Sequence, residues 1–430
     1  MKERVVCNRG IWLCGLVTVF ALIAFVPVSA QAVITEIIDS TGAGALDTFF
    51  EPWAIAVDGD GNVYVAGNSS NNAFKIAPFG FITEIIDSDG DDAGNGLLRP
   101  TGIAVDGAGN VYVVGDGSRN AFKITPGGVI SEIIDSTGDG AGNGFGFGQG
   151  IAVDDAGNVY VTASSTGNAF KISTPGTCST GGTPCTITEI IDSTGDGNGV
   201  NQLSNVRGIA VDGVENVYVV AAGQDHAFKI STPGTCSTGG TPCTITKIID
   251  ANGDNAGNTL DNPWAIAVDG DGNVYVAGAS SPHNAFKIDT PGTCSTGGTP
   301  CTITEIIDFD DGLQGPRGIA VDVAGNVYVA GNASENAFKI TPGGVITEII
   351  DSTGDGAGNT LDLARGIAVD GVGNVYVAGG GSNNAFKIGE PVFLIPALSL
   401  RGSLIALLLL FVGVALAGLS RRRSRRVTSA

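Results

Sequence analysis

The sequence predicts an all-β fold, a seven-bladed β-propeller of four-stranded antiparallel blades closed by an N-terminal strand that completes the last blade. Three observations predict it: a repeat of about 50 residues, four strand-like phrases in each repeat, and seven copies of each phrase. A parallel β-helix is the alternative, but its coils are usually shorter. A β-helix also does not require equal numbers of copies of the four phrases.

The first three phrases follow one another in a fixed order and form a predicted hairpin and a third strand. GIAVD or AIAVD ends at Asp58, Asp106, Asp154, Asp212, Asp269, Asp322 and Asp370. NVYV starts at Asn62, Asn110, Asn158, Asn216, Asn273, Asn326 and Asn374, and AFKI starts at Ala73, Ala121, Ala169, Ala227, Ala285, Ala337 and Ala385. Each phrase is rich in β-branched and aromatic residues and is bounded by Gly, Asn, Asp or Pro, which is typical of strands.

The fourth phrase is displaced by one strand relative to the others. ITEIID or a near copy occupies residues 34–39, 82–87, 130–135, 187–192, 245–250, 303–308 and 346–351, so one copy precedes the first IAVD and none follows the last AFKI. We therefore expect strand 33–39 to pair beside the last AFKI strand and to fasten the ring.

The phrases GIAVDGAGNVYV and NAFKITPGG resemble the NHL repeat and the related bacterial β-propeller repeat, over about residues 33–388. The chain departs from the NHL pattern where Gly67, Gly331 and Gly379 stand in place of an acidic residue after the second strand. The family includes ligand-binding modules, lyases and lactonases, so the resemblance implies a fold and no single activity.

The N-terminal end is predicted to be a signal peptide over residues 1–32. Lys2, Arg4 and Arg9 precede an apolar run over 11–28, and small residues at Ala30 and Ala32 suit signal peptidase. The predicted propeller then occupies residues 33–389.

The C-terminal end, residues 390–430, is predicted to hold a transmembrane helix over 404–419 and a basic tail, RRRSRR, at 421–426. With IPALSLRG at 395–402 it resembles the IPTL or PEP-CTERM-like sorting signals that exosortase-type proteases process, although Ala397 and Arg401 depart from that signature. The resemblance implies a bacterial protein exported to the cell envelope, cell surface or medium, at least transiently anchored in the inner membrane. A permanent single-span anchor is the alternative.

Charge separates the body from its ends. Residues 33–400 hold 13 basic and 42 acidic side chains, a net charge of about −29. Such a body repels polyanions, so we expect no nucleic-acid partner.

Six cysteines lie in three identical CSTGGTPC loops, and in an exported protein they predict local disulfides. The predicted pairs are Cys178 with Cys185, Cys236 with Cys243, and Cys294 with Cys301. Zinc is the alternative, but six intervening residues is an unusual ligand spacing.

A ligand site is predicted at the mouth of the central channel, where the residue two before the Ile of each IAVD should face inward. These residues are Trp53, Thr101, Gln149, Arg207, Trp264, Arg317 and Arg365. Two Trp and three Arg could stack on a carbohydrate or hold a small anion. The alternative is a linker position that tolerates any residue.

The Asp-rich linkers between blades place oxygen side chains at alternate positions, as a calcium loop does, although no bidentate Glu follows. The candidate calcium ligands are Asp87, Asp89, Asp91, Asp135, Asp139, Asp250, Asn252, Asp254, Asp351 and Asp355. The alternative is that these Asp residues bond their own backbone.

No catalytic motif is present, and the Asp that ends each IAVD is expected to clamp its hairpin. His226 and His283, the only histidines, are expected to be surface residues, although a lyase or lactonase could use one as a general base. The sequence thus favours an exported binding or structural module, with a propeller lyase or hydrolase as second hypothesis and a membrane-tethered scaffold without a small ligand as third.

Overall fold

The computed structural model describes residues 32–389 except 45–46, 92, 174–185, 198, 200, 232–243 and 290–301. Residues 1–31 of the predicted signal peptide, the predicted C-terminal helix and basic tail, and all three cysteine loops lie outside the described residues. Within the described ranges, no helix is long and apolar enough to cross a membrane.

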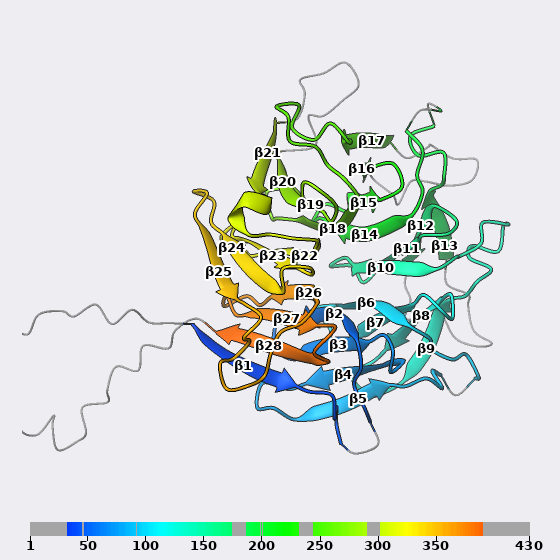
Figure 1. Ribbon diagram of the computed structural model, residues 1–430. Helices are drawn as coiled ribbons and strands as arrows, with labels where there is room; N and C mark the ends of the chain where they lie inside the picture. Colours follow the sequence, from blue (N-terminus) through cyan, green and yellow to red (C-terminus); the bar gives the residue numbers. More distant parts are fainter. Residues whose placement is uncertain are drawn as a thin grey trace, which may run out of the picture. The chain divides into compact units, whose positions relative to one another are not determined.

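Seven four-stranded antiparallel sheets surround a common centre, which confirms the predicted seven-bladed β-propeller (Figure 1). We number blades 1 to 6 from the sheet that begins with β2, and blade 7 is the sheet β1-β28-β27-β26. The first strands of neighbouring blades contact each other from β2 through β6, β10, β14, β18 and β22 to β26, and β26 contacts β2. These seven first strands are therefore the innermost ones.

Each blade repeats nearly the same strand lengths. Blade 1 consists of β2 (Pro52–Val57), β3 (Val63–Gly67), β4 (Asn72–Ile76) and β5 (Ile82–Ile86). Blade 2 consists of β6 (Pro100–Val105), β7 (Val111–Gly115), β8 (Asn120–Ile124) and β9 (Ile130–Ile134). Blade 3 consists of β10 (Gly148–Val153), β11 (Val159–Ala163), β12 (Asn168–Ser173) and β13 (Thr186–Ile191).

The remaining blades follow the same order. Blade 4 consists of β14 (Val206–Val211), β15 (Val217–Ala221), β16 (His226–Ser231) and β17 (Thr244–Ile249). Blade 5 consists of β18 (Pro263–Val268), β19 (Val274–Gly278), β20 (Asn284–Asp289) and β21 (Thr302–Ile307), and the 3-10 helix η2 (Phe309–Asp311) follows it. Blade 6 consists of β22 (Pro316–Val321), β23 (Val327–Gly331), β24 (Asn336–Ile340) and β25 (Ile346–Ile350), and blade 7 of β26 (Ala364–Val369), β27 (Val375–Gly379), β28 (Asn384–Gly389) and β1 (Val33–Ile38).

The hydrophobic core lies between blades rather than inside any one of them. The second strand of every blade is buried along its whole length, because both of its faces pack against neighbouring sheets. In one such layer, Tyr64 and Ala73 of blade 1 pack with Val113 and Phe122 of blade 2. This explains why the NVYV phrases are apolar without alternation.

A carboxylate clamp closes the first hairpin of each blade. In blade 1, Oδ1 of Asp58 accepts the backbone N–H groups of Asp60 and Asn62, and Oδ2 accepts Nδ2 of Asn62 and the hydroxyl of Tyr64. Gly61 has a φ of 81°, which a residue without Cβ adopts freely. The equivalent Tyr-to-Asp bond recurs in the other six blades, so the seven Asp residues have the structural role expected of them.

Blade 7 is assembled from both ends of the propeller sequence. β1 pairs antiparallel with β28, with Val33 opposite Gly389 and Ile34 opposite Ile388. Ile38 is 2% exposed and belongs to the core layer between blades 7 and 1. We call the β1–β28 pairing the seam.

Candidate functional site

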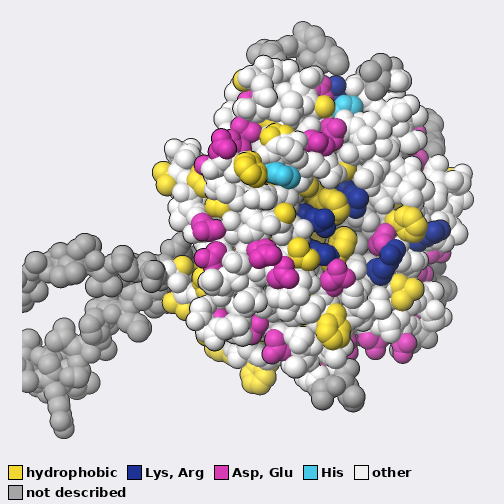
Figure 2. All heavy atoms as spheres, in the orientation of Figure 1, with side chains coloured by type: hydrophobic (Ala, Val, Ile, Leu, Met, Phe, Trp, Pro, Cys, Tyr) yellow, Lys and Arg dark blue, Asp and Glu magenta, His cyan; other side chains and the backbone are white. Residues whose placement is uncertain are grey.

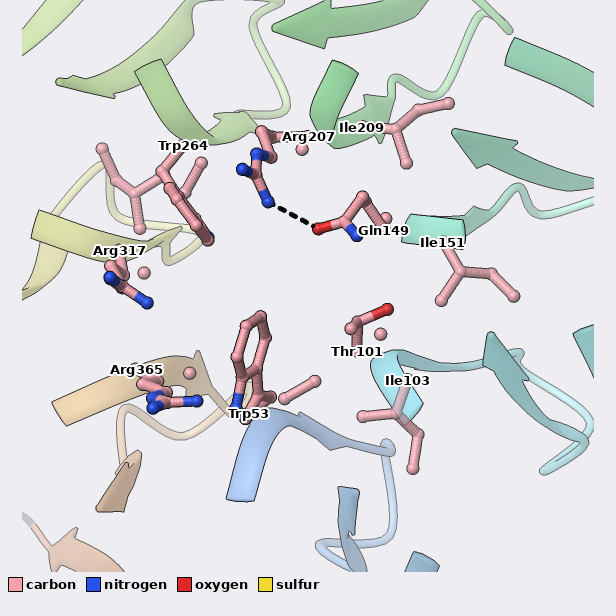
Figure 3. A pocket seen from close by; sticks show the side chains of 18 of the residues that line it. Trp53, Thr101, Ile103, Gln149, Ile151, Arg207, Ile209, Trp264, Arg317 and Arg365 are labelled. Atoms are coloured by element: carbon pink, nitrogen blue, oxygen red, sulfur yellow. Dashed lines mark hydrogen bonds between the residues drawn. The ribbon is translucent and has the colours of Figure 1, made fainter. Parts of the chain in front are cut away.

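A cavity of about 220 Å³ opens at the centre of the ring, and all seven predicted channel-mouth residues line it. They are Trp53, Thr101, Gln149, Arg207, Trp264, Arg317 and Arg365, together with the Ile two positions later in each first strand. Side chains at alternate strand positions share a face, so placing the Ile inward also places these residues inward. Figure 3 shows them converging from the innermost strands on one space.

Small residues between these positions let the innermost strands approach one another. A Cβ added to Gly150 would lie 2.6 Å from the carbonyl oxygen of Arg207, and one added to Gly318 would lie 2.4 Å from that of Arg365. Close backbone approach therefore excludes a side chain at Gly150 and Gly318, whereas blades 1 and 5 accommodate Ala54 and Ala265 at the same position.

The two Trp rings and three guanidinium groups form a stacked cluster. The Trp53 and Trp264 ring centroids are 6.5 Å apart, and Arg365 lies 4.4 Å from the Trp53 centroid. Arg207 and Arg317 lie 4.0 and 4.4 Å from the Trp264 centroid, on opposite sides of that ring (Figure 3). These contacts orient the guanidinium groups through cation–π attraction.

The three arginines differ in their polar partners. Nη2 of Arg365 donates to Oε1 of Glu51 at 2.9 Å. Nη1 of Arg207 donates to Oε1 of Gln149 at 2.9 Å, and Nε2 of Gln149 in turn donates to Asp116 at 3.2 Å. Arg317 makes no hydrogen bond or ion pair with any residue that the structure describes.

The cluster has an excess of donors and of positive charge. Four buried donor atoms of channel-mouth residues lack a partner among the described residues: Nε1 of Trp53, Nε of Arg207, and Nε and Nη1 of Arg365. Burial lowers the pKa of Arg207, Arg317 and Arg365, and repulsion from Arg365 and Arg207 lowers that of Arg317 further. A bound anion would relieve both effects.

The remaining channel-mouth residues form a neutral side of the cavity. The hydroxyl of Thr101 donates to the carbonyl of Gly148 at 2.9 Å, and Gln149 bridges Arg207 and Asp116. In Figure 2, the basic side chains gather with apolar ones at a hollow near the middle of this face, and acidic side chains lie around them. The cationic mouth is thus set in an acidic surface.

Neither histidine lines the cavity. Burial is the main cause that lowers the pKa of His226, whose ring lies edge-on to Phe228 with centroids 5.9 Å apart. Nδ1 of His283 lies 3.0 Å from the carbonyl oxygen of Ala279. Among the described lining residues there is also no Asp or Glu, so the cavity offers no carboxylate or imidazole as a general base.

Eight of the ten candidate calcium ligands accept hydrogen bonds within their own turns between blades. Oδ1 of Asp91 accepts the backbone N–H groups of Ala93 and Asn95, and Oδ2 accepts Nδ2 of Asn95. Asp139, Asp254 and Asp355 make the same bonds in their own turns, and Asp87, Asp135, Asp250 and Asp351 each accept the backbone N–H two residues later. The described ranges contain no group of three or more His, Cys, Asp or Glu placed to hold a metal ion. These local bonds favour the alternative to calcium binding, in which the Asp residues bond their own backbone.

Sequence reasoning missed Glu51, the carboxylate that neutralises Arg365. It lies four residues before Ile55, outside the phrase that was compared between copies. Extending that comparison by two positions would have shown Glu51 as the only acidic residue at this place in seven blades.

Sequence reasoning also missed a repeated Asn–Glu bond. In six blades, Nδ2 of the Asn before AFKI donates to the Glu of the ITEIID strand, as from Asn72 to Glu84 at 2.8 Å. Blade 4 carries His226 and Lys247 at these two positions, and Lys247 instead pairs with Asp250 at 2.8 Å. Both exceptions occur in the same blade, and this paired exchange can be recognised from the sequence alone.

The fold and the site define a seven-bladed β-propeller with a cationic, aromatic-lined channel mouth. The family model described as a beta-propeller repeat (SBBP) matches residues 52–75, 81–123, 140–171 and 316–339, so the chain carries SBBP beta-propeller repeats. No curated protein matches the chain in sequence.

Solved structures share the architecture at low sequence identity. A streptogramin B lyase is 16% identical, covers 84% of this chain and 98% of its own, and superposes with a TM-score of 0.59. A virginiamycin B lyase from Staphylococcus aureus is 15% identical, with 84% and 99% covered and a TM-score of 0.57. The hydrazine synthase of Kuenenia stuttgartiensis is 14% identical, with 79% and 96% covered and a TM-score of 0.53. At these identities the likeness shows the fold alone.

Proposed function

We propose that this protein is an exported cell-envelope binding module that holds a small anionic ligand at the mouth of its propeller channel. The observation that carries the proposal is the convergence of three guanidinium groups and two Trp rings on one cavity. Proteins rarely bury like charges together without a counterion, because desolvation and mutual repulsion both oppose it.

An anion fits this cavity better than a neutral carbohydrate does. Sugars bind Trp through an open ring face, but Arg207 and Arg317 cover both sides of Trp264 (Figure 3). The cavity, at about 220 Å³, is also smaller than the roughly 300–1,000 Å³ typical of sites for drug-sized ligands. We therefore favour a compact oxyanion such as a carboxylate, phosphate or sulfate, which accepts hydrogen bonds from guanidinium groups.

A propeller lyase or hydrolase is the second hypothesis. Proton abstraction needs an acceptor within about 3 Å of the substrate or one water away. The lining residues that the structure describes include no carboxylate or imidazole. The two carboxylates bonded to lining side chains, Glu51 and Asp116, already accept from Arg365 and Gln149, so the cavity favours binding over that reaction class.

The binding proposal is tested by titrating the purified propeller with inorganic phosphate, sulfate and acetate in a calorimeter at low ionic strength. We expect saturable binding of at least one anion, and Trp264→Ala should weaken it about tenfold because two cation–π contacts are lost. Arg119→Gln removes an arginine that stacks on Phe147 and does not line the cavity, and should leave binding unchanged. No heat and no rise in melting temperature with any of the three anions would refute the proposal.

The export proposal has a separate test. Signal peptidase should leave a mature N-terminus near residue 31 or 33, and an exosortase-type protease should remove the C-terminal segment after inner-membrane insertion. Mass spectrometry of the protein from its native envelope would identify both ends. An intact residue 1 would contradict export, and an intact C-terminus would favour the permanent anchor.

A further inference from the structure

One position beside the channel mouth holds the carboxylate that neutralises Arg365. It lies four residues before the Ile of each first strand, and its occupants in blade order are Glu51, Arg99, Phe147, Asn205, Asn262, Gly315 and Leu363. Six of the seven have φ between 49° and 57°, so the backbone has the same left-handed conformation in those six blades, and Phe147 is the exception. We call this the flank position.

Glu51, at the flank position of blade 1, reaches back to Arg365 of the preceding blade. Its Oε1 accepts Nη2 of Arg365 at 2.9 Å, and its Oε2 accepts the hydroxyl of Ser69. These bonds, with the charge of Arg365, lower the pKa of Glu51 despite its partial burial, so the residue stays anionic near neutral pH. Arg365 thus has an internal counterion.

The neighbouring arginine lacks such a counterion. Arg317 belongs to blade 6, and the flank position of the next blade is Leu363, which is apolar. Arg317 accordingly has no polar partner among the described residues, yet none of its nitrogen atoms is among the buried unpartnered ones. Its N–H groups therefore remain accessible at the cavity that it lines.

We propose that Arg317 is the principal oxyanion-binding residue of the channel mouth, and that Glu51 competes with the ligand for Arg365. This inference rests on the proposed anion-binding function. The free guanidinium presents parallel N–H donors that match a ligand with two acceptor oxygens, the geometry of a carboxylate, phosphate or sulfate. Stacking on Trp264 holds it in place before the ligand arrives.

The test removes the carboxylate beside Arg365 in one variant and places a carboxylate beside Arg317 in another. Calorimetric titration with inorganic phosphate measures the effect of each change on binding. Leu363→Glu places a carboxylate beside Arg317 in the backbone conformation that Glu51 already adopts, and should weaken phosphate binding at least about tenfold. Leu363→Gln is the matched uncharged control and should bind within about threefold of the parent. Glu51→Gln frees Arg365 and should strengthen binding severalfold.

A second comparison does not depend on whether Leu363→Glu folds. Arg317→Gln should weaken phosphate binding more than Arg365→Gln does, because only Arg317 is free of an internal partner. Equal losses in these two variants, or equal affinities of the Leu363→Glu and Leu363→Gln proteins, would overturn the inference while anion binding itself stood. Absence of phosphate, sulfate and acetate binding by the parent protein would remove both proposals.

Discussion

The hydroxyl of Tyr64 donates to Oδ2 of Asp58 at 2.9 Å, so the second strand of blade 1 is bonded to the turn that precedes it. Tyr64 is 2% exposed, and Lys75 lies 5.7 Å from the centroid of its ring. Because the acceptor is a carboxylate, this bond should contribute more than a bond between neutral groups.

Removing this hydroxyl should therefore destabilise the protein. We expect Tyr64→Phe, which keeps the ring, to lower the free energy of unfolding by about 1.5 kcal/mol, measured from the midpoint of urea denaturation. Thr41→Val removes an exposed donor to Asp39 and should change it by less than about 0.5 kcal/mol. Equal midpoints for the parent and Tyr64→Phe proteins would show that the clamp contributes nothing.

Stability should depend on pH in two opposite ways. Burial would raise the pKa of Asp58, but the bonds from Asn62, Tyr64 and the backbone outweigh it, so the net pKa is lowered. The stabilisation from Asp58 is therefore present above the unfolded value of about 3.9 and is lost as the pH falls through the lower folded value. Burial raises the pKa of Glu84 despite its bond from Asn72, so protonation of Glu84 stabilises the fold as the pH falls.

We accordingly expect the melting temperature to rise between about pH 7 and 5 and to fall below about pH 4. Glu84→Gln keeps an uncharged acceptor for Asn72. As the pH falls, the melting temperature of this variant should therefore rise less than that of the parent protein. Calorimetric scans across this pH range measure both effects. A steady fall from pH 7 to 5 in the parent would contradict the assignment of the raised pKa.

Deletion of residues 33–39 removes the outer strand of blade 7 and should lower the melting temperature. β28 would then have an exposed edge, and the layer between blades 7 and 1 would lose Ile38. The point variant Ile38→Ala should lower the free energy of unfolding by about 2–4 kcal/mol. Val33→Ala is the control and should have little effect, because Val33 is 58% exposed. An unchanged melting temperature after the deletion would count against closure of the ring by the seam.

The exchanged pair in blade 4 should be energetically coupled. His226→Asn and Lys247→Glu together recreate the bond found in the other six blades, whereas each alone leaves a mismatched partner. We expect the double variant to be more stable than the sum of the single effects by about 1 kcal/mol. Chemical denaturation of the four proteins measures this, and strict additivity would mean that the two positions do not interact.

Calcium should leave the melting temperature unchanged at about millimolar concentration, the range of weak extracellular sites. Both carboxylate oxygens of Asp91, and of its counterparts, already accept local N–H groups. Thermal scans with calcium and with a chelator compare the two states. A calcium-dependent rise that Asp91→Asn abolishes would instead establish the turns as metal sites.

Repetition made much of this fold predictable from one sequence. Phrases such as IAVD and NVYV gave the strands and their order, and the count of seven gave the blades, because each copy is an independent sample of the same local structure. β2 nevertheless begins at Pro52, before the phrase itself, since the ends of strands depend on pairing with neighbours rather than on local pattern.

The placement of the channel-mouth residues followed from strand alternation alone. Their differences did not, because the pairing of Arg365 with Glu51 joins residues 314 positions apart in sequence. The stacking of two arginines on Trp264 likewise depends on the distance across the ring, which only the assembled blades define.

The seam places Val33 opposite Gly389 at the outer edge of one blade. A short linker between these two residues would give a chain without a break in the ring, and new termini could be opened in any of the other outer turns. Such circular permutants should keep the same channel mouth while a different blade is assembled from two ends of the chain. In each permutant, the position of the new termini would decide which blade contains the seam. The binding site would not depend on the position of the seam.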